Sequence, residues 1–175
     1  MNAYNLKELE KNEIPTLAKK LSATDIDFLV QMLNEKDDKL RYNAFLLLQS
    51  NSREFPFVYE YWSEFEKKLE SSNSYQRSLG VMLISENVIW DKHGRFTDTI
   101  NKYLHCCNDE KFITARQTIQ GLEAVLKATD KFDNLIRQNL SDLRFSQYKE
   151  NQQRLLDKDR DNILGIIEKK SKPAK

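Results

Sequence analysis

Glycine and proline are scarce in this chain, with 4 glycines and 3 prolines in 175 residues. Average proteins contain about 12% of the two combined. A β-sandwich or a doubly wound sheet needs many turns rich in these residues, so their scarcity favours helices joined by short connections. Phosphate-cradling loops and dinucleotide fingerprints are also excluded, because the glycines stand alone at positions 80, 94, 121 and 165.

Cysteine and histidine are equally rare, and only His105, Cys106 and Cys107 stand together. Consecutive helical residues point about 100° apart, whereas a structural zinc site needs four converging ligands in spaced pairs. An iron–sulfur cluster needs several thiolates. We therefore expect no metal and no cofactor, and we interpret the cysteines as small buried hydrophobes.

The chain has no excess of either charge, since 28 Lys and Arg face 27 Asp and Glu. Nucleic-acid binders usually carry a basic surface, so this balance argues against such a partner. No run of 18 apolar residues occurs and the N-terminal stretch is too polar for a signal peptide, which predicts a cytoplasmic protein without membrane attachment. Nucleophile-elbow and zinc-protease motifs are missing, so we expect no enzyme.

Apolar residues recur at helical spacing along the whole chain. Residues 1–21 are predicted to form an N-terminal cap of one or two short helices. Thr24 is predicted to cap the next helix, with Asp27 completing a T-x-x-D box. Pro56 is expected to open a later helix. Four apolar stripes follow the cap, formed by Phe28, Leu29, Met32 and Leu33; by Phe57, Val58, Tyr61, Trp62, Phe65 and Leu69; by Ile100, Tyr103, Leu104 and Cys107; and by Phe132, Leu135, Ile136 and Leu140.

After each stripe comes a second helical segment that contains an arginine, namely Arg41, Arg77, Arg116 or Arg160. These arginines are 36, 39 and 44 residues apart, and apolar or small residues follow each at three and six positions. Such a period is typical of helical repeat arrays. It predicts one domain over residues 1–170, with about four helix pairs in 22–170 and a frayed tail at 171–175. An irregular helical bundle with arginines aligned by chance is the alternative.

The segments Asp38–Ala44 and Asp157–Ile163 resemble the opening of the second helix in HEAT repeats. Asn73–Asp91 and Asp109–Leu122 are similar to small bacterial HEAT-like proteins, some of which are labelled "SufBD protein". The resemblance implies an all-α, right-handed α-α superhelix of the HEAT/ARM type. It also implies an aspartate–arginine ladder between repeats, which assigns an inter-repeat structural role to Asp38, Asp157 and the four arginines. Trp90 is expected to cover the end of one repeat's core, with exposure at a binding rim as the alternative.

In such a solenoid the second helices line the concave side, which is the usual binding surface. Residues on these helices that avoid the core stripe are neutral and polar or small, with one aromatic: Tyr42, Gln49, Ser78, Ser85, Gln117, Gln120 and Ala124. This composition suits a protein or peptide better than phosphate. We therefore expect a non-catalytic protein–protein interaction module. Nucleic-acid binding, by analogy with HEAT-like DNA glycosylases, and structural self-association are the alternatives.

Overall fold

The structure is a computed structural model that describes residues 1–171. About 75% of it is helical, and the described residues contain ten α-helices and no strand, which confirms the all-α prediction. Of the tail predicted to fray, only Ser171 lies within this range, where it ends the last helix. No helix within residues 1–171 combines the length and the apolar composition that crossing a membrane requires.

Two short helices open the chain and pack on α4, and four consecutive helix pairs follow. We call the earlier member of each pair its first helix and the later member its second helix. The opening helices are α1 (Ala3–Glu8) and α2 (Ile14–Ala18), and the pairs are α3 (Ala23–Met32) with α4 (Asp38–Ser52), α5 (Trp62–Leu69) with α6 (Ser74–Asn87), α7 (Arg95–His105) with α8 (Phe112–Ala128), and α9 (Asp133–Asp142) with α10 (Glu150–Ser171). Three 3-10 helices join them, η1 (Phe57–Tyr61), η2 (Val88–Trp90) and η3 (Cys106–Asn108).

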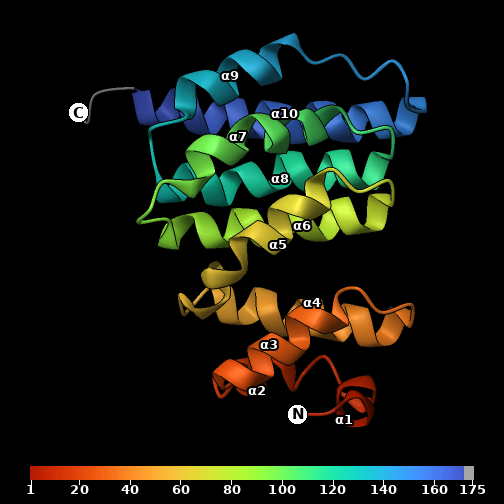
Figure 1. The fold of residues 1–175 in the computed structure, drawn as a ribbon. Helices are drawn as coiled ribbons and strands as arrows, with labels where there is room; N and C mark the ends of the chain where they lie inside the picture. Colours follow the sequence, from red (N-terminus) through yellow and green to blue (C-terminus); the bar gives the residue numbers. More distant parts are fainter. Residues whose placement is uncertain (172–175) are drawn as a thin grey trace.

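The second helices lie side by side in chain order, and the first helices lie in front of them (Figure 1). Helix α6 contacts both α4 and α8, and α8 also contacts α10. Helices α1 and α10 therefore lie at opposite ends of the stack (Figure 1). The apolar core runs between the two layers, because each helix turns its stripe toward the other layer.

Aromatic rings join consecutive first helices inside this core. The ring centroid of Phe96 lies 6.1 Å from that of Trp62 and 5.2 Å from that of Phe132, both in edge-to-face geometry. The Trp62 indole N–H donates to Thr99 Oγ1 at 3.0 Å. Trp62 and Phe65 are almost completely buried, so the stripe predicted to contain them faces the core.

Helix ends are stabilised by side chains from the following pair. The last carbonyls of a helix have no partner within it and need donors from elsewhere. Asn51 Nδ2 donates to the Ala18 carbonyl at 2.9 Å, and Gln76 Nε2 donates to the Leu33 carbonyl at 2.8 Å. The half-buried Trp90 packs against the core and donates its indole N–H to the Ser52 carbonyl at 2.6 Å. Trp90 therefore lies over the end of the α4 helix.

The predicted cap of α3 is wrong by two residues. Ser22, not Thr24, is the N-cap: its hydroxyl accepts from the Asp25 N–H at 3.2 Å, and the Asp25 carboxylate accepts from the Ser22 N–H at 3.0 Å. Two overlapping boxes, S-x-x-D and T-x-x-D, compete in this stretch, and the earlier one forms. Asp27 instead accepts a hydrogen bond from the Tyr61 hydroxyl.

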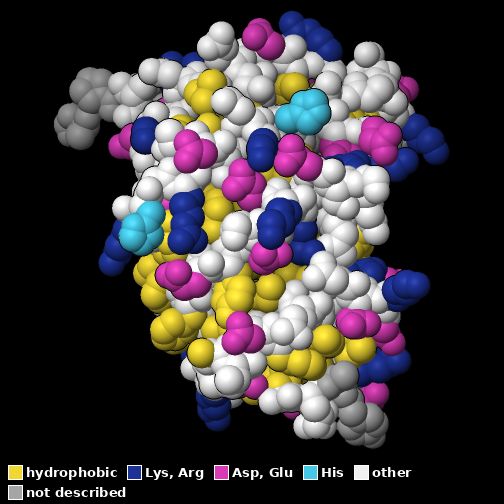
Figure 2. Space-filling model, in the orientation of Figure 1, with side chains coloured by type: hydrophobic (Ala, Val, Ile, Leu, Met, Phe, Trp, Pro, Cys, Tyr) yellow, Lys and Arg dark blue, Asp and Glu magenta, His cyan; other side chains and the backbone are white. Residues whose placement is uncertain are grey.

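Two residues of the predicted stripes are exposed. Phe57 is 53% exposed because residues 57–61 form a 3-10 helix, whose three residues per turn rotate Phe57 off the stripe that an α-helix would give. Leu135 is 39% exposed because α9 belongs to the last described pair, so no later helix covers its far side. On the face that carries the first helices, hydrophobic side chains gather in the lower half, around α3 and η1 (Figure 2).

Two helical glycines provide a matched test of this packing. A Cβ at Gly80 would lie 2.8 Å from the Phe65 carbonyl oxygen, whereas a Cβ at Gly165 would meet nothing within 4 Å. We expect Gly80→Ala to lower the free energy of unfolding by about 1–3 kcal/mol through overpacking. Gly165→Ala should raise it by about 0.5–1 kcal/mol through helix propensity. Urea denaturation followed by circular dichroism measures both, and equal effects of the two variants would contradict the close approach of α5 and α6.

Candidate functional site

The second helices α4, α6 and α8 share a hollowed face. Two adjoining hollows, of about 310 Å³ and 510 Å³, lie along it and share Gln49, Met82 and Gln117. We call the two together the second-helix groove. Their lining residues recur at intervals of three or four on each helix, as one helix face requires. They are Tyr42, Phe45, Leu46, Gln49 and Arg53 from α4 and its C-cap, Tyr75, Ser78, Leu79, Met82, Ser85 and Glu86 from α6, and Ile113, Gln117, Gln120, Gly121, Glu123, Ala124 and Lys127 from α8.

One half of the groove is apolar. Its walls include Leu46, Leu79 and Met82, and its rim carries Tyr42 and Ile113, which are 40% and 56% exposed. Large exposed hydrophobic residues are ordinary when they are scattered, but two on the rim of one apolar hollow form a continuous surface. This half can therefore receive an apolar side chain.

The other half is polar and carries no net charge. Arg53 Nη2 lies 2.7 Å from Glu86 Oε1, and Lys127 Nζ lies 2.7 Å from Glu123 Oε1. The hydrogen bond to Glu86 raises the pKa of Arg53, so this guanidinium stays charged and paired. Because both lining cations already have a carboxylate partner, this half offers no free positive charge to a phosphate.

Neutral amides fill the space between these ion pairs. Gln49 Nε2 donates to Glu86 at 3.1 Å, and Gln120 Nε2 donates to Asp159 of α10 at 3.0 Å. Gln117 lies where the two hollows join, and its side-chain oxygen Oε1 is buried and accepts no hydrogen bond from the described residues. A buried carbonyl without a donor is costly. The Gln117 amide oxygen is therefore enclosed without a donor at the junction of the two hollows.

All seven residues predicted for the concave face line this groove, but two of them are not accessible. Ser78 and Ser85 are 7% and 4% exposed because α8 covers them. The Ser78 hydroxyl is hydrogen-bonded to Thr114 Oγ1 at 2.9 Å, and Ser85 lies so close to Gly121 that a Cβ there would be 2.9 Å from Ser85 Oγ. These two serines therefore present little surface to a partner, because α6 has a neighbour on each side.

The sequence interpretation missed the apolar half of the groove. It assigned apolar residues to the core and considered only the remaining positions for binding, so it passed over Leu46, Leu79, Met82 and Ile113. Ile113 carried a signal: it lies directly after the first residue of its helix and outside the offsets that repeat after each arginine. Arg53 and Glu86 were missed because their pairing joins residues from two different helix pairs.

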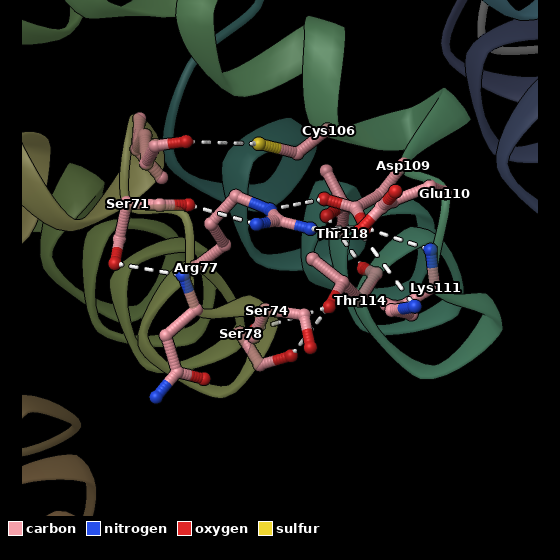
Figure 3. Close-up of polar contacts among 12 residues, drawn as sticks. Ser71, Ser74, Arg77, Ser78, Cys106, Asp109, Glu110, Lys111, Thr114 and Thr118 are labelled. Atoms are coloured by element: carbon pink, nitrogen blue, oxygen red, sulfur yellow. Dashed lines mark hydrogen bonds and ion pairs between the residues drawn. The ribbon is translucent and has the colours of Figure 1, made fainter.

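A buried ion pair joins the second and third pairs beside the groove (Figure 3). Arg77 Nε and Nη2 donate to the two carboxylate oxygens of Asp109 at 2.5 and 2.8 Å, and Nη1 donates to the Ser71 carbonyl at 2.7 Å. Asp109 also accepts from the Lys111 N–H at 2.8 Å. The side chains of Arg77 and Asp109 are only 11% and 4% exposed. This cluster fixes the α6–α8 junction and presents no open site.

The other arginines have different partners. Arg116 Nε donates to Asp159 of α10 at 2.8 Å, which joins the third and fourth pairs. Arg41 stacks on the Tyr75 ring of α6, with its guanidinium carbon 4.1 Å from the ring centroid. Arg160, in the last described helix, pairs with Asp157 and Asp161 of its own helix.

The ladder expected from Asp38 and Asp157 is not formed. Each of these aspartates pairs with the arginine three residues later in its own helix, as side chains at that spacing share a face. Among the four aligned arginines, Arg77 and Arg116 do reach carboxylates of the following pair, and their shortest contacts are with Asp109 and Asp159. The register explains the difference: Asp38 and Asp157 each lie one turn before the arginine of their own helix, whereas Asp109 precedes its helix and lies against α6.

Both cysteines are buried, and burial disfavours ionisation of their thiols. Cys106 and Cys107 are 2% and 0% exposed. Burial raises the pKa of the Cys106 thiol to about 11 and that of Cys107 further. Within the described part of the chain, no three His, Cys, Asp or Glu residues converge as metal ligands would.

Breaking the Arg77–Asp109 pair should destabilise the fold strongly. Arg77→Met keeps most of the aliphatic stem but leaves the Asp109 carboxylate buried without its cation, so we expect the free energy of unfolding to fall by about 3 kcal/mol. Arg154→Met is the control, because Arg154 and Glu150 are 77% and 79% exposed and their pair should contribute less than about 0.5 kcal/mol. Urea denaturation compares them, and similar losses would refute the importance of the buried pair.

Thiol reactivity should depend on unfolding. With its pKa near 11, Cys106 is a thiolate in about one molecule per thousand at pH 8, and the thiolate is the reactive form. The folded protein should therefore react with a chromogenic disulfide over hours and faster as pH rises, whereas both thiols should react within seconds in urea. Rapid reaction of one thiol in the folded protein at pH 8 would contradict the predicted protection of the thiols by burial.

Comparison with known proteins found no family model, curated protein or solved structure that is significantly similar to the chain.

Proposed function

We propose that this chain is a short HEAT-like α-solenoid, a right-handed stack of about four helix pairs with α1 and α2 as its N-terminal cap. In this proposal it is a non-catalytic module that binds a segment of another protein in the second-helix groove. The observation that carries the proposal is the groove itself: an apolar hollow that adjoins a polar hollow without net charge on three consecutive second helices.

Hydrogen bonds between pairs support the repeat assignment. Trp62 to Thr99, Ser78 to Thr114 and Gln49 to Glu86 join residues that are 37, 36 and 37 positions apart. These three contacts between consecutive pairs therefore share nearly the same interval, which is what a repeat array would give. The described α-helices outside the cap also alternate between two layers (Figure 1).

The groove favours a protein segment with one apolar anchor and uncharged neighbours. A leucine- or phenylalanine-sized side chain buried between Tyr42, Met82 and Ile113 would contribute about 1.5–3 kcal/mol. Micromolar affinity requires about 8 kcal/mol, so the polar half has to contribute as well. Backbone amides of an extended segment suit this half, because Gln49 and Gln120 keep further hydrogen-bonding capacity.

Charge favours this occupant over nucleic acid. Phosphate binding depends on unpaired Lys and Arg side chains, and the cations that line the groove, Arg53 and Lys127, are each paired with a carboxylate. A strongly acidic or basic segment would have to break one of these pairs. An uncharged segment would not.

Selection from a random peptide library tests the proposal and requires no candidate partner. Twelve-residue peptides displayed on phage should enrich sequences with a Leu, Ile, Phe or Met anchor among uncharged residues. A selected peptide, labelled and followed by fluorescence polarisation, should bind Ile113→Glu and the double variant Tyr42→Ala with Gln117→Ala at least tenfold more weakly, because these changes remove the rim and the buried acceptor. Leu135→Glu, on α9, is the matched control and should bind as the wild type does.

Three results would refute the proposed function. The selected peptides could bind the groove variants and the wild type equally, the library could yield only strongly charged sequences, or a gel shift at low salt could show tight DNA binding that the groove variants retain.

A further inference from the structure

A lysine is buried at the junction of the first two pairs, away from the second-helix groove. Lys68 of α5 is 8% exposed, and its ammonium donates to Asn34 Oδ1 at 2.7 Å and to Gln76 Oε1 at 2.5 Å. Gln76 in turn donates to the Leu33 carbonyl at 2.8 Å, which holds its amide oxygen toward Lys68. The ammonium is therefore fixed in place by neutral oxygens.

This charge lacks a counter-ion. No carboxylate of the described residues lies within 4.0 Å of Lys68 Nζ, although buried ammonium groups are normally paired. Glu64 is the nearest acid on the same helix, but it is hydrogen-bonded to Lys67 at 2.8 Å. Arg41 lies close enough to add repulsion, and its own carboxylate partner is Asp38. Burial lowers the pKa of Lys68 to about 8; attraction to Glu64 opposes this shift, and repulsion from Arg41 adds to it.

Lys68 also lines an open hollow. A pocket of about 360 Å³ is bounded by Lys68 and by Asn34, Glu64, Lys67, Ser71, Asn73 and Gln76, which are all polar. An ammonium has three N–H donors, and the two amide oxygens use two of them. The lining charges are two lysines and one glutamate, so the pocket has one positive charge in excess.

We propose that this pocket, which we call the Lys68 pocket, binds a small oxyanion, either a carboxylate or a phosphate group, through the remaining N–H of Lys68. The oxyanion supplies the counter-charge that the protein does not provide. Lys67 and Glu64 pair with each other at the pocket wall, so Lys68 carries the excess charge, while the side chains of Ser71 and Asn73 also line the pocket. This site is independent of the second-helix groove, so either proposal can fail without the other.

Protonation and anion binding must be linked at this site. An oxyanion binds the ammonium and not the neutral amine, so bound anion raises the pKa of Lys68 above about 8, and affinity falls as pH rises through that value. The ¹³Cε resonance of Lys68 reports its protonation directly. It should titrate near pH 8 in sodium chloride and at higher pH in sodium acetate or sodium phosphate of the same ionic strength.

The two sources of oxyanion are distinguished by the salts. A pKa increase in acetate alone identifies a carboxylate site, and an increase that is larger in phosphate identifies a phosphate site. Affinity for the effective anion should be at least tenfold higher at pH 6.5 than at pH 9.5. An unchanged pKa in both salts overturns the proposal.

Variants distinguish an anion-binding role of Lys68 from a purely structural role. Glu64→Gln removes the only carboxylate that lines the Lys68 pocket, so the anion should bind severalfold more tightly. Because the Glu64 side chain is half exposed, the fold should persist in this variant. Lys68→Met should abolish binding, and circular dichroism shows whether that variant is folded. If Glu64→Gln leaves anion affinity unchanged or weakens it, Lys68 has only a structural role.

Discussion

Consecutive first helices are held together by aromatic rings that none of them can bury alone. Trp62, Phe96 and Phe132 come from three successive pairs, and each ring packs edge-on against the next. A two-helix unit leaves one side of such a ring in water, so every pair depends on a neighbour for its hydrophobic stabilisation. The same dependence governs the polar contacts: Asn51, Gln76 and Trp90 each donate to a helix-end carbonyl of an earlier helix. Packing and hydrogen bonding therefore specify one order of stacking.

Sequence periodicity predicted the helices well because a stripe of 3.6-residue spacing depends only on its own helix. Trp62, Phe65 and Tyr103 lie in the core for this reason. The same reasoning failed where the local geometry or the number of neighbours changed. Phe57 lies in a 3-10 turn, Leu135 lies in the last described pair, and Ser78 and Ser85 lie on a helix with a neighbour on each side. A stripe gives the direction of a side chain around its helix, but not the distance to the next helix.

The register between neighbouring helices also could not be determined from the sequence. Aligning the arginines places Arg116 opposite Arg77, at an interval of 39, whereas Ser78 faces Thr114 at an interval of 36. A shift of three residues is nearly one helical turn, so the apolar offsets still match. The ion-pair partners of the arginines do not match: Arg77 pairs with Asp109, which precedes α8, and Arg116 pairs with Asp159 on α10. The candidate groove was predicted as a polar surface for a related reason, since its apolar half exists only where α4, α6 and α8 adjoin.

Glycine marks the closest approaches between helices in the middle of the stack. Because Gly80 has no side chain, the α5 backbone can approach α6 closely. Gly121 likewise allows Tyr103 and Ser85 to lie close to α8. These close contacts and the buried Arg77–Asp109 pair all lie in α5–α8. Local stability varies within a folded protein, and helices with many buried contacts open at the highest free energy. We therefore expect amide hydrogens of α6 and α8 to exchange with solvent more slowly than those of the short helix α1.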